Sequence, residues 1–394
     1  MGNLERPRAS EEVGRFGRVE YVRHRGRFTG STARGPYSVP YEVTAPLNAV
    51  GGNNRLVFEP PHFADGLNVR NVILGPRSIF GRGFAHASVG YGNNGLAILD
   101  ARPGFEVVLA GRPYSPAPPV VEDFEIMAQF VGALRENPHN LVGRVEKVYG
   151  IGFSNSGRAV REVLRQPFGQ NLFDFSIPGN TGPFNSLPGR GRVMVFNTEF
   201  DWVPVNETSP DYRRYAVAGG PHIPDCEELR EQIPPGPQGP PPIAGTTPLN
   251  WLPFLRALFV AGDRWVTEGV EPPPSVVLKL TPAGDQIARD ARGNALGGIR
   301  HPALELGEAR FLASVGRQPG NWRLYGGYDN VVSVGAPGFQ KNFGQYVKAF
   351  NAAAKALERA GLLLDEDERR LSRQAMLNPQ ATFTQNYQAG LFAP

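Results

Sequence analysis

Along the 394-residue chain, short apolar runs alternate with longer stretches in which apolar residues follow a helical repeat. Apolar residues recur every three or four positions in 121–137, 249–269 and 343–364, and this spacing predicts helices. Short runs rich in Val, Ile, Phe and Tyr predict strands; they lie at 54–63, 83–92, 145–153, 173–179, 192–200, 213–222 and 275–280. Strands that alternate with helices indicate an α/β fold with a mainly parallel central sheet.

Two regions outside the predicted parallel strands have a different composition. Residues 17–46 are rich in Val, Tyr and Thr without a helical repeat, which predicts antiparallel strands before the parallel part. The segment 233–245 is proline-rich, and it must cross the surface because proline cannot join a sheet interior. We expect 1–394 to form a single domain in which 223–275 is an insertion like a lid and 338–394 is a C-terminal helical region.

Composition narrows the class of protein. A hydrophobic content of 41% suffices for a sizeable core, and Cys226, the single cysteine, excludes an intrachain disulfide and a cysteine-based metal cage. The balance of 41 basic against 37 acidic residues, with no basic block interleaved with aromatics, argues against nucleic acid as a partner. No apolar run is long enough to span a membrane, and the N-terminus has no signal-like apolar stretch. We expect a cytoplasmic protein, or an exported one whose signal has been removed.

The stretch "YGIGFSNSGR" (149–158) carries the candidate chemistry. A buried-strand pattern runs into Gly152-Phe153-Ser154-Asn155-Ser156, and a helical pattern follows. A nucleophile elbow has this form: the serine sits on a strained strand-to-helix turn, with small residues two positions away on either side. Ser156 and then Gly157 stand where glycine usually follows the serine. We predict Ser154 as the nucleophile, because Ser156 would lie in the first helical turn, where serine acts as a cap.

A serine nucleophile needs a histidine base and an acid that orients it, and in this fold they follow in the order Ser, acid, His. Two histidines lie downstream of Ser154, namely His222 and His301. His222 ends a predicted strand, "RRYAVAGGPH", whereas His301 follows a Gly-rich turn. The preceding strand ends in "FNTEFDW", which offers Glu199 and Asp201. We predict His222 as the base and Asp201 as the acid, with Glu199 as the alternative.

The oxyanion of an acyl-transfer intermediate needs two backbone N–H donors. The residue after the nucleophile, Asn155, supplies the first at the positive end of the predicted helix. The second comes from the loop after an early core strand, here "EPPHFADG" (59–66). Its two prolines have no N–H, so His62 or Phe63 is the candidate; His62 could instead line the substrate pocket.

Several stretches together resemble a poorly characterised family of bacterial α/β-hydrolase-domain proteins, and more distantly the elbow of tannases and feruloyl esterases. The resemblance runs from about residue 20 to the C-terminus and is carried by "RGRFTG", "LVFEPPHF", "GRGFAHASVGYG", "YGIGFSNSGR", "FNTEFDW", "YAVAGGPH", "DARGNALGGIRHP" and "AGLLLDEDERRL". It implies an α/β-hydrolase fold and serine-esterase chemistry, with Ser154 as the serine and His222 as the histidine. It does not name a substrate.

Two functional hypotheses follow. The first is a serine esterase of the carboxylesterase class, which acts on a small-molecule ester through an acyl-enzyme and needs no metal or organic cofactor. The alternative is a catalytically silent α/β-hydrolase-fold protein that acts in binding or as a scaffold. A nucleotide site at "GYGNNG" (90–95) is not favoured, because the stretch lacks the Lys-Ser/Thr of a P-loop.

Overall fold

The structure is a computed structural model that describes residues 2–47, 51–64, 67–69, 73–91, 120–136, 139–182, 184–185, 188–205, 209–224, 246–314, 324–329, 331–332 and 342–377. The chain forms two compact units. Unit 1 holds the described residues of Met1–Val193 and of Glu207–Tyr212, and unit 2 holds those of Met194–Asn206 and those from Arg213 onward. Each unit is described by itself below.

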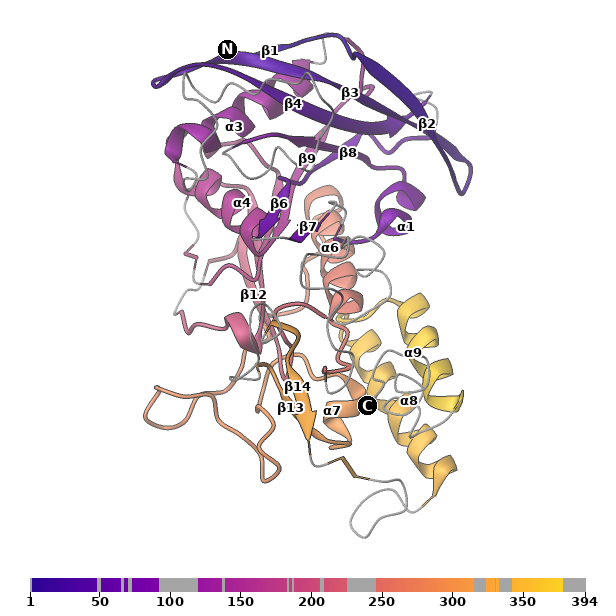
Figure 1. Cartoon of the computed structure of the whole chain (residues 1–394). Helices are drawn as coiled ribbons and strands as arrows, with labels where there is room; N and C mark the ends of the chain where they lie inside the picture. Colours follow the sequence, from indigo (N-terminus) through magenta and orange to yellow (C-terminus); the bar gives the residue numbers. More distant parts are fainter. Residues whose placement is uncertain are drawn as a thin grey trace. The chain divides into compact units, whose positions relative to one another are not determined.

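Unit 1 is built around a mixed sheet (Figure 1). Its strands follow the order β1-β3-β4-β8-β5-β9-β10, with β2 also paired to β3. The pairs from β1 to β8 are antiparallel, and β8, β5, β9 and β10 are parallel to one another. The strand bounds are β1 Asn3–Leu4, β2 Ala9–Phe16, β3 Val19–Thr32, β4 Gly35–Pro46, β5 Arg55–Phe58, β8 Ala85–Val89, β9 Lys147–Phe153 and β10 Phe175–Gly179.

Two helices complete the core of unit 1. Helix α3 (Val121–Glu136) lies where the apolar repeat predicts it, and helix α4 (Asn155–Arg165) lies where a helical pattern follows Ser154. Helix α3 buries an apolar stripe in which the Phe130 ring packs against Phe28, Tyr41 and Phe58. Helix α4 buries Ala159, Val160, Val163 and Leu164 and contacts β9 and β10. Shorter elements are the β6 (His62–Ala64) and β7 (Leu67–Val69) hairpin, α1 (Pro76–Ile79), η1 (Phe80–Arg82) and η2 (Pro167–Gly169).

Unit 2 combines two further sheet strands with helices. Strand β11 (Arg192–Thr198) and strand β12 (Tyr212–Val217) are neighbours, and each has its carboxyl end in this unit. The remaining elements are η3 (Glu199–Asp201), α6 (Leu252–Thr267), α7 (Pro302–Glu305), the antiparallel pair β13 (Arg310–Leu312) and β14 (Gly327–Asp329), α8 (Phe343–Arg359) and α9 (Asp365–Leu377). Helices α8 and α9 run side by side (Figure 1).

The structure confirms the expected fold class, a mainly parallel sheet with antiparallel N-terminal strands, and corrects one predicted strand. The run 275–280 is not a regular strand, because Val276, Leu278 and Leu280 form only single bridges to different partners. The aromatic residues of 249–269 pack within the unit: Trp251, Phe254 and Phe259 are fully buried. Residues 225–245, including Cys226, lie outside the described residues, so the lid remains a prediction.

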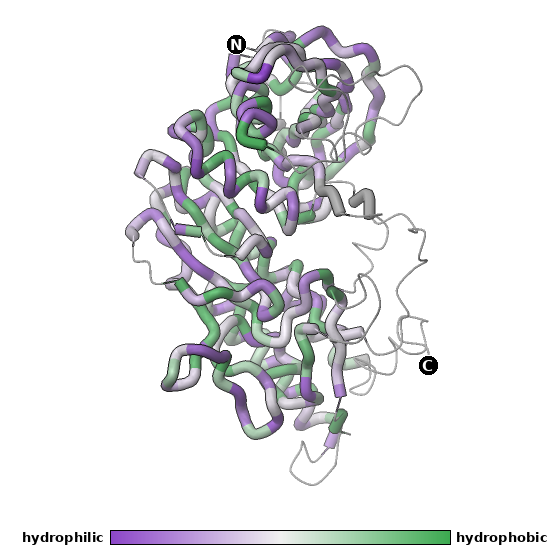
Figure 2. The backbone as a smooth tube through the Cα atoms, turned by 60° about the vertical axis from the view of Figure 1, so that its left-hand side comes forward, coloured by the Kyte–Doolittle hydropathy of each residue, from purple (hydrophilic) through white to green (hydrophobic). Residues whose placement is uncertain are grey.

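Hydropathy changes over short distances along the chain (Figure 2). Apolar and polar stretches alternate along strands and helices alike, as expected of elements with one buried face. Among the described helices, none combines the length and apolar character required to cross a membrane.

One buried acid in unit 2 gives a pH-dependent contribution to stability. Glu308 is 2% exposed; its Oε1 accepts from the Tyr346 hydroxyl at 2.8 Å, and burial raises its pKa from 4.5 to about 7. Between pH 4.5 and about pH 7 the folded chain therefore keeps this proton, whereas the unfolded chain loses it. The stability that the protonated group contributes is fully present below pH 4.5 and is lost as the pH rises to about 7.

Glu308→Gln stays neutral over this range. We expect its free energy of unfolding, relative to that of the wild type, to rise by about 2–4 kcal/mol from pH 5 to pH 8. Denaturant unfolding at both pH values measures the difference. A difference that is constant over this range would contradict the argument.

Candidate active site

Ser154 occupies a strained turn between β9 and α4. Its backbone angles are φ 54° and ψ −119°, in a region that side chains other than glycine rarely enter. The Ser154 N–H donates to the carbonyl of Gly179, at the end of neighbouring strand β10, at 2.9 Å. The side chain makes no cap for the helix that it precedes. This is the backbone geometry of a nucleophile elbow, in which the strand-to-helix turn projects the serine hydroxyl.

The neighbours of Ser154 explain why the elbow needs small residues. A Cβ on Gly152 would lie 2.4 Å from the Ser156 carbonyl carbon, and a Cβ on Gly157 would lie 2.4 Å from the Gly179 carbonyl oxygen. Ser156 is 1% exposed, and its Oγ lies 2.8 Å from both the backbone N and the backbone O of Phe153. Ser156 therefore ties the helix start back to the end of β9. Its side chain is small enough for the turn and is engaged as a structural bridge.

We expect Gly157→Ala to destabilise the protein by more than about 2 kcal/mol and to remove reactivity at Ser154, because the added Cβ meets a backbone oxygen that cannot move alone. Gly132→Ala is the matched control: the added Cβ on helix α3 meets nothing within 4 Å, and alanine favours a helix by about 0.5–1 kcal/mol. Thermal unfolding of both variants measures the difference. An equally small effect at both sites would contradict the close approach.

The predicted oxyanion donors belong to the same unit as Ser154. Asn155 is the first residue of α4, at the positive end of that helix. The backbones of His62 and Phe63 form β6, which pairs with β7 and lies beside α4. The loop before them is held at Glu59: its carboxylate accepts from the Ile73 N–H at 3.3 Å and lies 3.1 Å from His86 Nε2.

In unit 2, the structure pairs the predicted base with one of the two predicted acids. His222 Nδ1 lies 2.8 Å from Asp201 Oδ2, and both side chains are nearly buried, with exposures of 10% and 13%. Asp201 ends η3, directly after β11, and His222 follows β12. The Thr198 hydroxyl donates to the same Asp201 oxygen at 3.2 Å. With a proton on Nδ1, the imidazole donates to the carboxylate and keeps Nε2 as the basic nitrogen.

The loop that carries His222 is held by hydrogen bonds of the residues directly before and after it. The fully buried Trp251 donates from Nε1 to the Pro221 carbonyl at 3.1 Å, and the Ile223 N–H donates to the Leu324 carbonyl at 2.8 Å. The Phe200 ring lies beside the imidazole, with centroids 5.4 Å apart. These bonds hold the backbone of the His222 loop, and the Phe200 ring limits the space beside the imidazole. No sequence pattern indicates Thr198 as a partner of Asp201 or Trp251 as a support of the His222 loop.

The alternative residues have other partners. The Glu199 carboxylate accepts from Arg289 Nη2 and from the Gly219 N–H, each at 2.7 Å. His301 is 4% exposed between the rings of Phe254 and Phe350; burial lowers its pKa to about 4, and its Nδ1 caps α7 by accepting from the Ala303 N–H. His301 is therefore a core histidine. Of the two acids that the sequence left open, Asp201 is the one bonded to His222.

The described residues contain no group of three or more His, Cys, Asp or Glu side chains arranged to hold a metal ion.

Residues 111–373 match the model of a family described as alpha/beta hydrolase domain, which is more than half of the chain. The chain belongs to the alpha/beta hydrolase family. The matched region contains Ser154, Asp201 and His222, which follow one another in the order that the triad of an α/β hydrolase is expected to have. The sequence matches no curated protein.

Three solved structures match parts of this chain. Brefeldin A esterase, a bacterial homologue of human hormone sensitive lipase, matches with 15% identity and a TM-score of 0.25 over 40% of this chain and 40% of its own length. A cold-adapted esterase from an Arctic intertidal metagenomic library has 16% identity and a TM-score of 0.30 over 50% and 77%. An alpha/beta hydrolase from a Medee basin deep-sea metagenome library has 15% identity and a TM-score of 0.29 over 46% and 72%. At these scores the assignment of the fold rests on the family match.

Proposed function

We propose that this alpha/beta hydrolase is a carboxylic-ester hydrolase that works through an acyl-enzyme on Ser154. The observation that carries the proposal is the strained backbone of Ser154, φ 54° and ψ −119°, at the junction of β9 and α4. Backbone strain of this kind persists where it serves a function, because it costs about 1–3 kcal/mol. The bond between His222 and Asp201 supplies a base that is already oriented.

In the proposed reaction, the Ser154 hydroxyl attacks the ester carbonyl while His222 Nε2 takes its proton. Asp201 holds the imidazole by Nδ1 and stabilises the imidazolium that forms. The N–H of Asn155 and an N–H of β6, from His62 or Phe63, bind the oxyanion. His222 returns the proton to the departing alcohol. Water then attacks the acyl-enzyme by the same route and releases the acid, so the cycle needs no metal or organic cofactor.

A fluorophosphonate probe tests the proposal directly. The probe forms a covalent bond only with an activated serine, so we expect the wild type to be labelled on the peptide that contains Ser154 and the Ser154→Ala variant to remain unlabelled. Labelling should disappear in parallel with hydrolysis of p-nitrophenyl acetate. A folded wild type that takes no label and hydrolyses no ester would be the catalytically silent protein of the alternative hypothesis.

The acyl chain that the site accepts can be measured once turnover is established. A series of p-nitrophenyl esters from two to sixteen carbons, compared by kcat/KM, assigns the acyl preference. Each buried methylene contributes about 0.8 kcal/mol, so a pocket fitted to one length should discriminate by several-fold per added carbon until it is full.

A further inference from the structure

Glu199 is a buried carboxylate whose two oxygens are bound on opposite sides. Oε2 accepts from the backbone N–H of Gly219 and Oε1 accepts from Arg289 Nη2, both at 2.7 Å. The side chain is 4% exposed, so its charge is removed from water. A buried carboxylate costs several kcal/mol unless a partner compensates its charge, and Arg289 is that partner. Neither bond involves the imidazole of His222.

The positions of Glu199 and Gly219 along the chain show which two loops the carboxylate connects. Glu199 lies two residues before Asp201 in η3, and Gly219 lies three residues before His222, in a left-handed conformation with φ 67°. The carboxylate of Glu199 therefore joins the loop that carries the acid to the loop that carries the base. The Phe200 N–H adds a second link, to the Gly220 carbonyl at 3.3 Å. Both links lie within a few residues of the 2.8 Å bond between Asp201 and His222.

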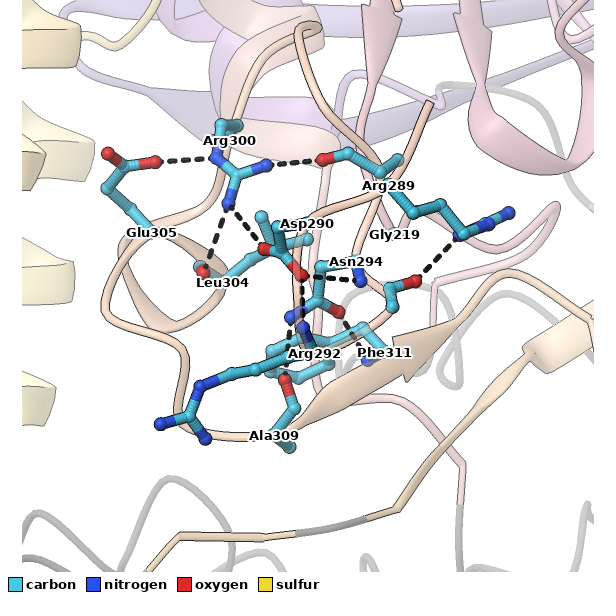
Figure 3. Close-up of polar contacts among 12 residues, drawn as sticks. Gly219, Arg289, Asp290, Arg292, Asn294, Arg300, Leu304, Glu305, Ala309 and Phe311 are labelled. Atoms are coloured by element: carbon cyan, nitrogen blue, oxygen red, sulfur yellow. Dashed lines mark hydrogen bonds and ion pairs between the residues drawn. The ribbon is translucent and has the colours of Figure 1, made fainter. Parts of the chain in front are cut away.

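Arg289 lies in a loop that is held by hydrogen bonds between its own residues (Figure 3). Its Nη1 donates to the Gly293 carbonyl at 3.0 Å, and Asp290 Oδ1 accepts from the backbone N–H groups of Arg292 and Asn294 at 2.9 Å. Asn294 in turn bonds the backbone of Ala309 and Phe311. The guanidinium of Arg300 points toward Glu305 and Asp290.

The same loop is attached to the strand that leads to the base. Ile299 exchanges backbone hydrogen bonds with Ala216 and Ala218, at 2.7 Å and 3.0 Å, next to the end of β12. Apart from Arg289 itself, the loop lies in "DARGNALGGIRHP" (290–302), one of the stretches that carry the family resemblance.

We propose that Glu199 and Arg289 are positioning residues that hold the loops of Asp201 and His222 at the separation that their bond requires. The inference rests on the proposed ester hydrolysis, in which that bond orients the base. In this proposal Glu199 is not the triad acid. The 289–300 loop contributes to the reaction although none of its residues needs to touch the substrate.

The first test is a double-mutant cycle in p-nitrophenyl acetate hydrolysis, with Glu199→Gln, Arg289→Met and both together. Rates are divided by the number of serines that a fluorophosphonate titrates, so that misfolded protein does not count. We expect each single variant to lower kcat by roughly 10–100-fold with KM within about two-fold, and the double variant to be no worse than the worse single one, because the two residues act as one unit. Arg289→Lys should restore part of kcat.

The matched control is Arg264→Met, which breaks a 3.0 Å pair between Arg264 and Glu268 on the surface of α6, where both side chains are about half exposed. Exposed pairs contribute little, so kcat should change less than about two-fold.

The pH profile separates positioning from a long-range charge effect. The acid limb of kcat/KM reports the protonation of the imidazole. If only charge mattered, removing the negative Glu199 would move the limb to lower pH, and removing the positive Arg289 would move it to higher pH. If the pair positions Asp201, both variants weaken the carboxylate–imidazole bond, and both move the limb to lower pH.

Limbs that move in opposite directions, or single variants that keep kcat within two-fold, would overturn the inference. So would a Glu199→Gln variant as inactive as Asp201→Asn beside an unaffected Arg289→Met, because Glu199 would then be the acid itself. Failure of the proposed function is different: the wild type would neither take the label nor hydrolyse esters. In that case proton NMR still tests the positioning, because the low-field Nδ1–H signal of His222 should broaden or vanish in both variants.

Discussion

Ser154→Ala is expected to abolish ester turnover, with a loss of about 10⁵–10⁶-fold if chemistry limits the rate, as for serine nucleophiles in general. The change removes one oxygen and keeps the Cβ, so the strain at φ 54° is the same in both proteins and the fold should be unaffected. Hydrolysis of p-nitrophenyl acetate measures the loss, and thermal unfolding should give the same midpoint for both proteins.

Two companion variants make this result specific. Ser154→Gly removes both the hydroxyl and the strain, because glycine tolerates positive φ, so it should be inactive yet more stable than Ser154→Ala by about 1–3 kcal/mol. Ser156→Ala removes the bridge to Phe153 and should cost about 1–2 kcal/mol of stability while leaving a protein that takes the fluorophosphonate label. If Ser156→Ala were inactive and Ser154→Ala active, the nucleophile would be misassigned.

The parts of the site that local sequence determines could be predicted. The elbow depends on Gly152, Ser154 and Gly157 within six residues. A Cβ on Gly152 would meet the backbone of Ser156, and a Cβ on Gly157 would meet the carbonyl oxygens of Gly152 and Gly179. The strands before and after it are marked by continuous apolar runs, which a parallel sheet buried on both faces requires. The order of the serine, the acid and the histidine then follows from the succession of strand ends.

The choice between Glu199 and Asp201 could not be made from the sequence. Both follow the same strand, and only two positions separate them. The structure separates them because the single turn of η3 directs one carboxylate to Arg289, ninety residues away in the chain, and the other to His222. The run 275–280 shows the same limit, because a local pattern does not reveal the distant partners of a segment. Its apolar pattern predicts a strand, but its partners are single residues from three different segments.

Asp201→Asn is expected to lower kcat by up to about 10⁴-fold while the protein stays folded, because the side chain keeps its shape and loses only its charge and one acceptor. The carboxylate accepts from His222 Nδ1–H and so leaves Nε2 free of a proton and basic. The asparagine amide can instead donate to Nδ1, which stabilises the tautomer with the proton on Nε2, and this tautomer cannot take a proton from Ser154. The Thr198 hydroxyl, which shares the Asp201 oxygen, cannot replace the lost charge.

His222→Ala should reduce kcat nearly as far as Ser154→Ala, since without a base the hydroxyl remains a weak nucleophile. Combining His222→Ala or Asp201→Asn with Ser154→Ala should add nothing to the loss from the serine alone, because the three groups act only together. Glu199→Gln, which leaves the Asp201 carboxylate in place, should remain well above Asp201→Asn. A His222→Ala variant that retains full turnover while His301→Ala does not would show that the bonded pair in unit 2 is structural, and that the base is the histidine which the structure describes as buried between Phe254 and Phe350.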